Sequence, residues 1–393
     1  MRILLSLTNL EIGGAQLFVV YLANEFIRRQ HEVVLYIHQP DYIDSSLLSL
    51  LDKKVIIVSF CNAPRLRKIL WHLNGITQKL FSLYFIEKLN MWVFKNTIHT
   101  FRPDIINSQM SYSDWVIARC VKNNKKRNYK FIITSHGEYE LGVIKKASAL
   151  ECMESCDALL LVAKKNYDAL INLSERAKYL PYRIIPIGFS EDLKPSKHRT
   201  KKDLNIPETS FVIGMVARGI PEKGWQEMIA AFDLVYKNFP DTFLILIGQG
   251  NYLEKIVQQK NHPNIIRISP KNTMDFLKYL PLFDIGVLPS YFEGESFPNI
   301  LVQYLFYHIP IIATDIGDIH KIVEHPKGPC GLLIPLKNKK VSVQNIYSAI
   351  RHLMENKSLY YLYKKNTSIV KNDYHISMIA QKYLEFYESI LRR

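Results

Sequence analysis

The segment with the most chemical character is residues 288–315, LPSYFEGESFPNILVQYLFYHIPIIATD, where a loop carries Glu293 and Glu295. An apolar run over 285–288 predicts a strand before the loop, and a helical pattern follows from about Pro298 to His308. A helix N-terminus offers unpaired N–H groups and partial positive charge, which suits a phosphate. Carboxylates accept hydrogen bonds from hydroxyls. Phosphate and hydroxyl recognition in one place indicates a sugar nucleotide as the natural ligand.

A second segment, residues 216–224 (VARGIPEKG), places Arg218 and Lys223 five positions apart in a loop that follows an apolar run. Two such cations can neutralise a diphosphate, Arg as a planar fork and Lys as a point charge. Basic residues in loops are often only solvated. Because ligands of α/β sheets bind at the carboxyl ends of the strands, we favour a binding role here.

Glycines and a histidine follow three further apolar runs. Gly13 and Gly14 form a turn before a helical pattern, Gly248 and Gly250 follow another run, and His136 lies in the sequence TSHGE. Glycine lets a backbone approach a ligand closely, and Gly248 and Gly250 would leave room for a flat base. The dinucleotide fingerprint G-x-G-x-x-G is absent at the first turn. An ordinary tight turn, or a structural histidine, remains an equal alternative for each of these segments.

The elements that must position these residues alternate between strand-like and helix-like patterns along the whole chain. This alternation is the signature of parallel α/β sheets, and the 393 residues are enough for two of them. The polar segment 187–201 is the best boundary. We therefore predict an N-terminal domain over 1–187, a second domain over 188–371 and a C-terminal helix over 372–393 that packs back toward the N-terminal domain. The amphipathic pattern of this helix runs over 376–391.

The formal charge of +15 indicates a polyanionic partner, namely nucleic acid, an anionic membrane or a phosphorylated ligand, although it also serves general solubility. The N-terminal apolar run is short and reaches an acid at Glu11, so we interpret it as a strand rather than a signal peptide. No apolar run reaches the ~18 residues of a spanning helix. Five cysteines without zinc-like spacing predict reduced thiols, and hence a cytoplasmic protein.

Residues 64–102 mix basic and aromatic side chains, with Glu87 as the one acid between Pro64 and His99. Such helices suit an anionic membrane surface, with aromatic rings inserted and cations at the headgroups. A second basic cluster spans 122–130. The aromatic residues could equally form the core face of ordinary surface helices. We expect no nucleic-acid partner, because no recognised nucleic-acid module is present and the charge is spread over both halves.

Together these segments resemble glycosyltransferase family 4, a family of retaining enzymes with the GT-B fold. The resemblance covers nearly the whole chain. It is carried by the Gly13–Gly14 turn, His136–Gly137, the link around 185–188, Arg218-x4-Lys223, Gly248-x-Gly250 and the segment 288–315. It implies two Rossmann-like domains with parallel sheets facing a central cleft, a nucleotide-sugar donor held mostly by the second domain, and no metal or other cofactor.

The resemblance also implies roles for individual residues. Arg218 and Lys223 would bind the diphosphate, His136 would contact the donor sugar, and Glu295 would hold sugar hydroxyls. The further donor-binding residues would be Gly13, Gly14, Gly248, Gly250, Ser296, Phe297, Asn299 and Gln303.

The E-x7-E pattern of the family begins at Glu295, because the eighth residue after Glu293 is the apolar Leu301. The second position holds Gln303 where the family usually has a glutamate that binds the ribose. An amide still forms hydrogen bonds, but losing a charge-assisted bond costs on the order of 1 kcal/mol. Weaker donor binding is therefore expected, and a catalytically inactive member is left open.

The sequence as a whole predicts a retaining hexosyltransferase that moves a sugar from a UDP- or GDP-sugar to a hydroxyl of a lipid-linked or polysaccharide acceptor. The setting we expect is assembly of a bacterial surface polysaccharide such as lipopolysaccharide, capsule or exopolysaccharide, at the inner face of the cytoplasmic membrane. The alternatives are a non-catalytic scaffold, which Gln303 favours, and a sugar-nucleotide epimerase, for which Glu138 is a weak candidate acid or base.

Overall fold

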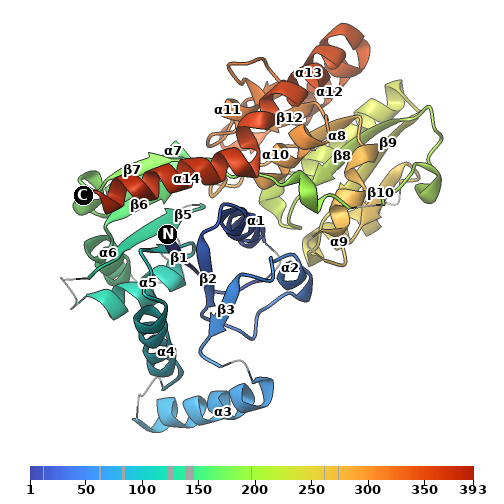
Figure 1. Ribbon diagram of the computed structural model, residues 1–393. Helices are drawn as coiled ribbons and strands as arrows, with labels where there is room; N and C mark the ends of the chain where they lie inside the picture. The colour runs from blue at the N-terminus through green and yellow to red at the C-terminus, as the bar shows by residue number, and fades with distance from the viewer. Residues whose placement is uncertain are drawn as a thin grey trace. The chain divides into compact units, whose positions relative to one another are not determined.

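The computed structural model describes residues 1–11, 13–61, 63–81, 85–122, 127–137, 146–195, 197–260, 262–272 and 274–393. The chain forms two compact units (Figure 1). The first comprises Met1–Pro186 together with Ile379–Arg393, and the second comprises Ile187–Met378. No helix among the described residues is both long and apolar enough to cross a membrane.

The first unit is built on a seven-stranded sheet in the order β3-β2-β1-β4-β5-β6-β7, and every neighbouring pair is parallel. The central strands are buried along nearly their whole length, as expected when helices cover both faces. The strands are β1 (Arg2–Leu7), β2 (Glu32–Ile37), β3 (Ile56–Ser59), β4 (Ile105–Ser108), β5 (Lys130–Ser135), β6 (Ala158–Leu161) and β7 (Tyr182–Ile184). The helices are α1 (Gly14–Arg28), α2 (Ser45–Ser49), α3 (Pro64–Phe81), α4 (Phe85–Phe101), α5 (Ser111–Val121), α6 (Lys146–Ser155) and α7 (Lys164–Leu173).

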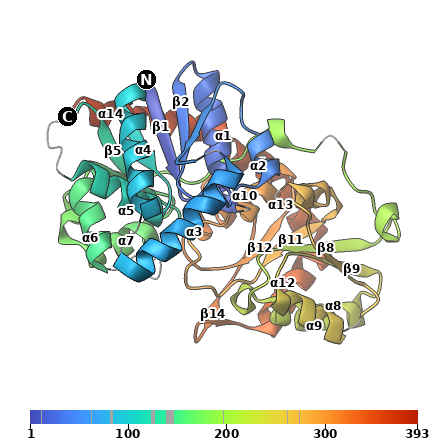
Figure 2. The same ribbon diagram turned by 90° about the horizontal axis from the view of Figure 1, so that it is seen from below.

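The last helix of the chain, α14 (Ile376–Leu391), supplies part of the core of this first unit (Figure 1 and Figure 2). Its Tyr383 and Tyr387 are fully buried, with ring centroids 5.9 Å from Phe18 and 6.0 Å from Phe26 respectively. Both phenylalanines lie on α1. The amphipathic pattern over 376–391 therefore exists because its apolar face completes the packing of α1.

The second unit contains a six-stranded parallel sheet in the order β10-β9-β8-β11-β12-β13, and a short antiparallel pair formed by β14 and β15. The strands are β8 (Phe211–Val216), β9 (Thr242–Ile247), β10 (Ile265–Ile268), β11 (Ile285–Leu288), β12 (Ile311–Thr314), β13 (Gly331–Ile334), β14 (Leu336–Lys337) and β15 (Lys340–Val341). The helices are α8 (Trp225–Asn238), α9 (Asn251–Lys260), α10 (Asn299–Phe306), α11 (His320–Val323), α12 (Val343–Glu355) and α13 (Lys357–Val370).

The chain passes between the units twice, at Pro186–Ile187 and at Met378–Ile379. The two passages are joined near their second-unit ends: Phe189 N donates to Tyr374 O at 2.9 Å, and Ile376 N donates to Phe189 O at 3.0 Å. The predicted segment 372–393 differs from this arrangement, because residues 372–378 pack with the second unit and α14 begins only at Ile376.

Candidate active site

The centre of the candidate site in the second unit is an ion pair between Lys223 and Glu295. Nζ of Lys223 lies 2.5 Å from Oε2 of Glu295, and each residue is only 7% exposed. Ser290 Oγ donates to the same carboxylate oxygen at 2.7 Å. The ammonium group has three hydrogens, so two remain for another acceptor. No described residue donates a hydrogen bond to Oε1 of Glu295, which leaves that oxygen for a hydroxyl.

The two loops that carry this pair are fastened to one another by their backbones. Tyr291 N donates to Glu222 O at 2.8 Å, and Glu295 N donates to Phe292 O at 2.9 Å. Both loops follow the carboxyl ends of neighbouring parallel strands, β8 and β11. That edge is where open α/β sheets bind ligands.

Arg218 lies beside the pair on an exposed loop. Its guanidinium carbon is 5.4 Å from the centroid of the Phe292 ring, and Lys223 Nζ is 5.1 Å from the same centroid. One aromatic face therefore carries both cations, within the range of cation–π attraction. This arrangement brings together the two cations that the sequence placed in one loop, and it adds Phe292, which the sequence analysis did not single out.

The backbone conformation and the close packing at Gly224 favour glycine over any residue with a Cβ atom. Its φ is +79°, and a Cβ atom at this position would collide with the carbonyl oxygen of Pro289. The loop of Lys223 can therefore turn into α8 and still lie against the strand end that leads to Glu295.

Gly248 and Gly250 are also explained by close packing. A Cβ atom on Gly250 would lie 2.6 Å from the carbonyl oxygen of Gly219, and one on Gly248 would collide with that of Ala217. Gly219 N also donates to Gln249 O at 2.8 Å. These glycines let two loops at the carboxyl ends of β8 and β9 approach one another. This packing explains why glycine occupies both positions, and the sequence alone did not predict it.

The four residues predicted around the start of α10 differ in what they offer. The Phe297 ring is buried and packs on Tyr374, with centroids 5.7 Å apart, so it is part of the core. The Ser296 hydroxyl is buried without a hydrogen-bond partner among the described residues. Asn299 is the first residue of α10 and is partly exposed, whereas Gln303, one turn later, is only 4% exposed.

Glu293 lies outside this buried cluster. Its carboxylate is largely exposed and pairs with Lys339 at 2.6 Å. The two glutamates of the loop are therefore distinguished by burial, with Glu295 inside and Glu293 at the surface.

The first unit places His136 directly after the carboxyl end of β5. Its Nε2 is 2.7 Å from Oε1 of Gln109, which follows β4, and its ring meets Phe18 edge-on at 5.7 Å. Burial disfavours the charged imidazolium and lowers the pKa of His136 to about 4. The imidazole is consequently neutral at physiological pH.

Gly13 and Gly14 form the turn into α1, with Gly13 at its N-cap position. The amide of Gln16 lies against Gly13, where a Cβ atom would collide with Oε1 of Gln16. Nε2 of Gln16 donates to Asn9 Oδ1 at 2.9 Å. The glycine turn thus accommodates a side chain of the protein itself. Glu138, the weak candidate for epimerase chemistry, lies outside the described residues.

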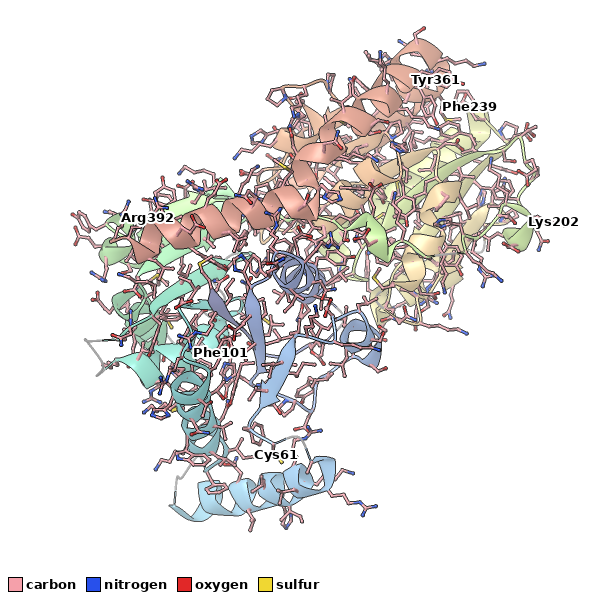
Figure 3. The ribbon with its side chains drawn as sticks, viewed as in Figure 1. Cys61, Phe101, Lys202, Phe239, Tyr361 and Arg392 are labelled. Atoms are coloured by element: carbon pink, nitrogen blue, oxygen red, sulfur yellow. The ribbon has the colours of Figure 1, made fainter. Side chains whose placement is uncertain are left out.

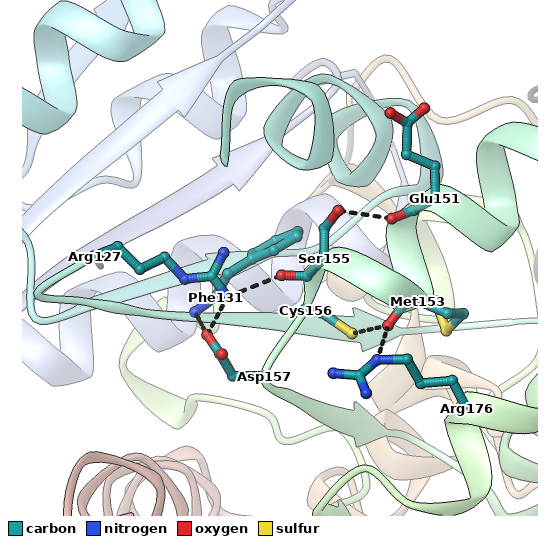
Figure 4. A network of polar contacts seen from close by, with 8 residues as sticks. All are labelled: Arg127, Phe131, Glu151, Met153, Ser155, Cys156, Asp157 and Arg176. Carbon is teal, nitrogen blue, oxygen red and sulfur yellow. Dashed lines mark hydrogen bonds and ion pairs between the residues drawn. The ribbon is translucent and has the colours of Figure 1, made fainter. Parts of the chain in front are cut away.

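A cavity of about 470 Å³ lies in the first unit near the amino ends of β5 and β6. Figure 4 shows polar contacts among residues that line it, such as those of Arg127 and Asp157. Two of its cations are in short ion pairs: Arg127 with Asp157 at 2.6 Å, and Lys122 with Glu151 at 2.9 Å. The cavity lies at the opposite edge of the sheet from His136, and none of the predicted catalytic residues is among its described lining residues.

Two parallel α/β units, each with polar residues gathered at the carboxyl ends of its strands, define a protein of the GT-B fold class. Residues 12–188 match the family described as Glycosyltransferase Family 4, and residues 196–373 match Glycosyl transferases group 1. The chain belongs to the group 1 glycosyltransferases.

Two curated relatives illustrate the range of the family. The chain is 26% identical over 246 residues to an alpha-monoglucosyldiacylglycerol synthase of Acholeplasma laidlawii, which is 58% of this chain and 57% of that protein. It is 24% identical over 250 residues to the capsular polysaccharide biosynthesis glycosyltransferase CapM of Staphylococcus aureus, covering 60% and 63%. These matches span less than two thirds of the relatives' own lengths.

Solved structures show the same fold over the whole chain. HepE of Anabaena in complex with UDP-glucose superimposes with a TM-score of 0.74 at 18% identity, covering 99% of this chain and 100% of that one. A sucrose-phosphate synthase of Thermosynechococcus elongatus gives a TM-score of 0.75 at 17% identity, with both chains covered completely. The predictions of the family and of the GT-B fold are confirmed, and the family matches support a transferase enzyme.

Proposed function

We propose that this glycosyltransferase is a retaining hexosyltransferase that moves a sugar from a UDP- or GDP-sugar to a hydroxyl of a lipid-linked or polysaccharide acceptor. The observation that carries the proposal is the buried Lys223–Glu295 pair beside Arg218. Arg218 and Lys223 can bind the two phosphates of the donor. Oε1 of Glu295 can accept hydrogen bonds from the sugar hydroxyls. The names of relatives support a surface polysaccharide or glycolipid as product, such as capsule or exopolysaccharide.

The charges of this chain supply the electrostatic part of the mechanism. Negative charge develops on the departing nucleoside diphosphate, and Arg218 and Lys223 stabilise it as preorganised cations. This is the work that a metal performs in other transferases, and the proposed reaction needs no metal or other cofactor. Glu295 is held by Lys223 and Ser290, so it orients the sugar and does not act as a nucleophile. Front-face attack, with the leaving phosphate accepting the acceptor proton, then retains the anomeric configuration.

The experiment is release of nucleoside diphosphate from a panel of UDP- and GDP-sugars. Turnover that is lost in Arg218→Ala supports the transferase, because Arg218 is exposed and we expect the variant to keep the fold. A protein that neither binds nor turns over any nucleotide sugar would support the scaffold alternative. A product with an inverted sugar centre and no transfer would support the epimerase.

The acceptor side of the proposal places the first unit at an anionic membrane surface. On α3, the side chains of Leu66, Ile69 and Leu73 are exposed at spacings of three and four residues, so they form one face of the helix. Ile69 is 57% exposed, and Trp92 of α4 is 66% exposed. Figure 3 shows α3, next to Cys61, lying apart from the sheet of its unit.

The edge of this face has a second role. Leu70, four residues after Leu66, packs against a small cluster formed by Phe60, Cys61 and Ile86. Arg65 and Lys68 are exposed beside the apolar face. An apolar helix face flanked by cations binds the interface of anionic lipids, because acyl chains receive the apolar residues and phosphates receive the cations. We therefore propose that α3 docks the enzyme on the cytoplasmic membrane, where a lipid-linked acceptor is found.

A further inference from the structure

A chain of hydrogen bonds runs from the last helix to His136 through buried side chains. Tyr387 Oη donates to Oδ1 of Asn107 at 2.7 Å, and Gln109 Nε2 donates to the same oxygen at 2.5 Å. Gln109 Oε1 then lies 2.7 Å from Nε2 of His136. Tyr387 and Asn107 are fully buried, and Gln109 is nearly so.

The direction of every bond in this chain follows from one backbone carbonyl. Asn107 Nδ2 lies 3.1 Å from the carbonyl oxygen of Ile132, which can only accept a hydrogen bond. The nitrogen of the Asn107 amide must therefore face Ile132, and its oxygen must face Tyr387 and Gln109. Reversing the amide would place two acceptors against each other, which buried groups do not tolerate.

The same reasoning determines the orientation of the Gln109 amide and then the tautomer of His136. Because Oδ1 of Asn107 accepts, Gln109 must present its nitrogen to it, and its oxygen therefore faces His136. An amide oxygen can only accept, so Nε2 of His136 carries the hydrogen. In a neutral imidazole the other nitrogen, Nδ1, then has a lone pair. No described residue forms a hydrogen bond with Nδ1.

We propose that Tyr387, Asn107 and Gln109 are positioning residues that fix His136 as an Nε2–H tautomer, whose Nδ1 accepts a hydrogen bond from a substrate hydroxyl. The inference rests on the proposed function for the identity of that hydroxyl, which belongs to the donor sugar or the acceptor. The tautomer itself does not depend on it. His136 is therefore a hydrogen-bond acceptor for the substrate, not a donor or a cation. The burial that lowers its pKa favours the same neutral form.

The decisive measurement is ¹⁵N NMR of the full-length protein labelled at its 12 histidines, with His136→Gln used to assign the signal. Protonated and unprotonated ring nitrogens differ widely in chemical shift, so the tautomer is read without substrate. We expect Nε2 protonated and Nδ1 unprotonated in the wild type. Protonation of Nδ1 instead would overturn the inference, whether or not the enzyme transfers sugar.

The variant Gln109→Met keeps the length of the side chain but removes the amide donor and replaces the amide oxygen by a thioether, which is only a weak acceptor. We expect the His136 ¹⁵N signals to move toward a mixture of tautomers. Tyr387→Phe removes one donor further along the chain, and we expect kcat to fall about two- to tenfold with little change in KM. If neither variant changes the ¹⁵N shifts or kcat, the positioning role is wrong.

Tyr383→Phe is the matched control. Tyr383 lies one turn before Tyr387 on α14 and is equally buried, but its hydroxyl interacts with Thr134 and not with Asn107. We expect this variant to keep the wild-type ¹⁵N signals and kcat. A loss equal to that of Tyr387→Phe would show that α14 acts only through packing, and would overturn the inference. Wild-type tautomer signals without any sugar transfer would instead contradict the proposed function alone.

Discussion

Lys223 and Glu295 are separated by 72 residues in the sequence, yet Nζ of one lies 2.5 Å from Oε2 of the other in a buried setting. Breaking such a pair leaves an uncompensated buried charge, which costs about 3–5 kcal/mol. We expect Lys223→Ala and Glu295→Ala each to lower the urea midpoint strongly. Loss of activity in either variant therefore has two causes that must be separated.

The double variant Lys223→Met, Glu295→Gln separates them. It removes both charges at once, and we expect it to recover most of the lost stability without recovering release of nucleoside diphosphate. Removal of the exposed pair, by Lys339→Ala, is the control and should leave the urea midpoint unchanged, because exposed ion pairs contribute little. A fully active double variant would contradict the assigned roles of Lys223 and Glu295.

Two glycines should respond in opposite directions to alanine. Gly224→Ala forces a Cβ atom onto the carbonyl oxygen of Pro289 at φ +79°, so we expect a loss of at least about 1 kcal/mol together with reduced activity. Gly75→Ala lies in α3 with nothing within 4 Å of the new atom, so we expect a gain of about 1 kcal/mol. Urea unfolding of the two variants measures both effects.

Gln303→Glu tests the departure from the family pattern. The new carboxylate would accept charge-assisted hydrogen bonds from the ribose hydroxyls, and we expect the donor to bind up to about tenfold more tightly. Because residue 303 is only 4% exposed, the free protein should become less stable. Calorimetric titration with UDP and GDP measures the affinity. Unchanged affinity for both nucleotides would place residue 303 outside the donor site.

Stability should fall in mild acid because His38 is buried in its neutral form. Burial lowers the pKa of His38 to about 3, compared with 6.5 in the unfolded chain. Below pH 6.5 the imidazole of His38 binds a proton in the unfolded state but not in the folded state. The free energy of unfolding therefore decreases by about 1.4 kcal/mol for each pH unit because of this histidine. His38→Asn should flatten the dependence of the urea midpoint between pH 7 and pH 5. His72→Gln, at an exposed position of α3, should not.

The membrane proposal predicts that Ile69→Glu abolishes flotation with anionic vesicles at low salt. The new charge would enter the acyl region and repel the phosphates. Leu362→Glu is the matched control, because Leu362 is also an exposed apolar residue on a helix, but lies in the second unit on α13. Equal binding of Ile69→Glu and wild type would contradict the role of α3.

The sequence predicted the strands and the loop residues well, because both depend on short local patterns. The runs 285–288 and 376–391 coincide with β11 and α14. The same local patterns predicted the binding residues that closely follow a strand in the sequence, such as Arg218 and Lys223. Side chains that complete the site from afar were not found. Tyr387 reaches Asn107 across 280 residues of sequence, and no local pattern marks such a contact.

Because Ile379–Arg393 packs into the first unit, this unit cannot finish folding when its first 186 residues leave the ribosome. Domains usually fold in order during synthesis. Here Phe18 and Phe26 stay uncovered, and Asn107 lacks its tyrosine donor, until the second unit has been made and the last turns of α14 emerge. The nascent chain therefore exposes an apolar surface for most of its translation, which makes it a natural client for chaperones.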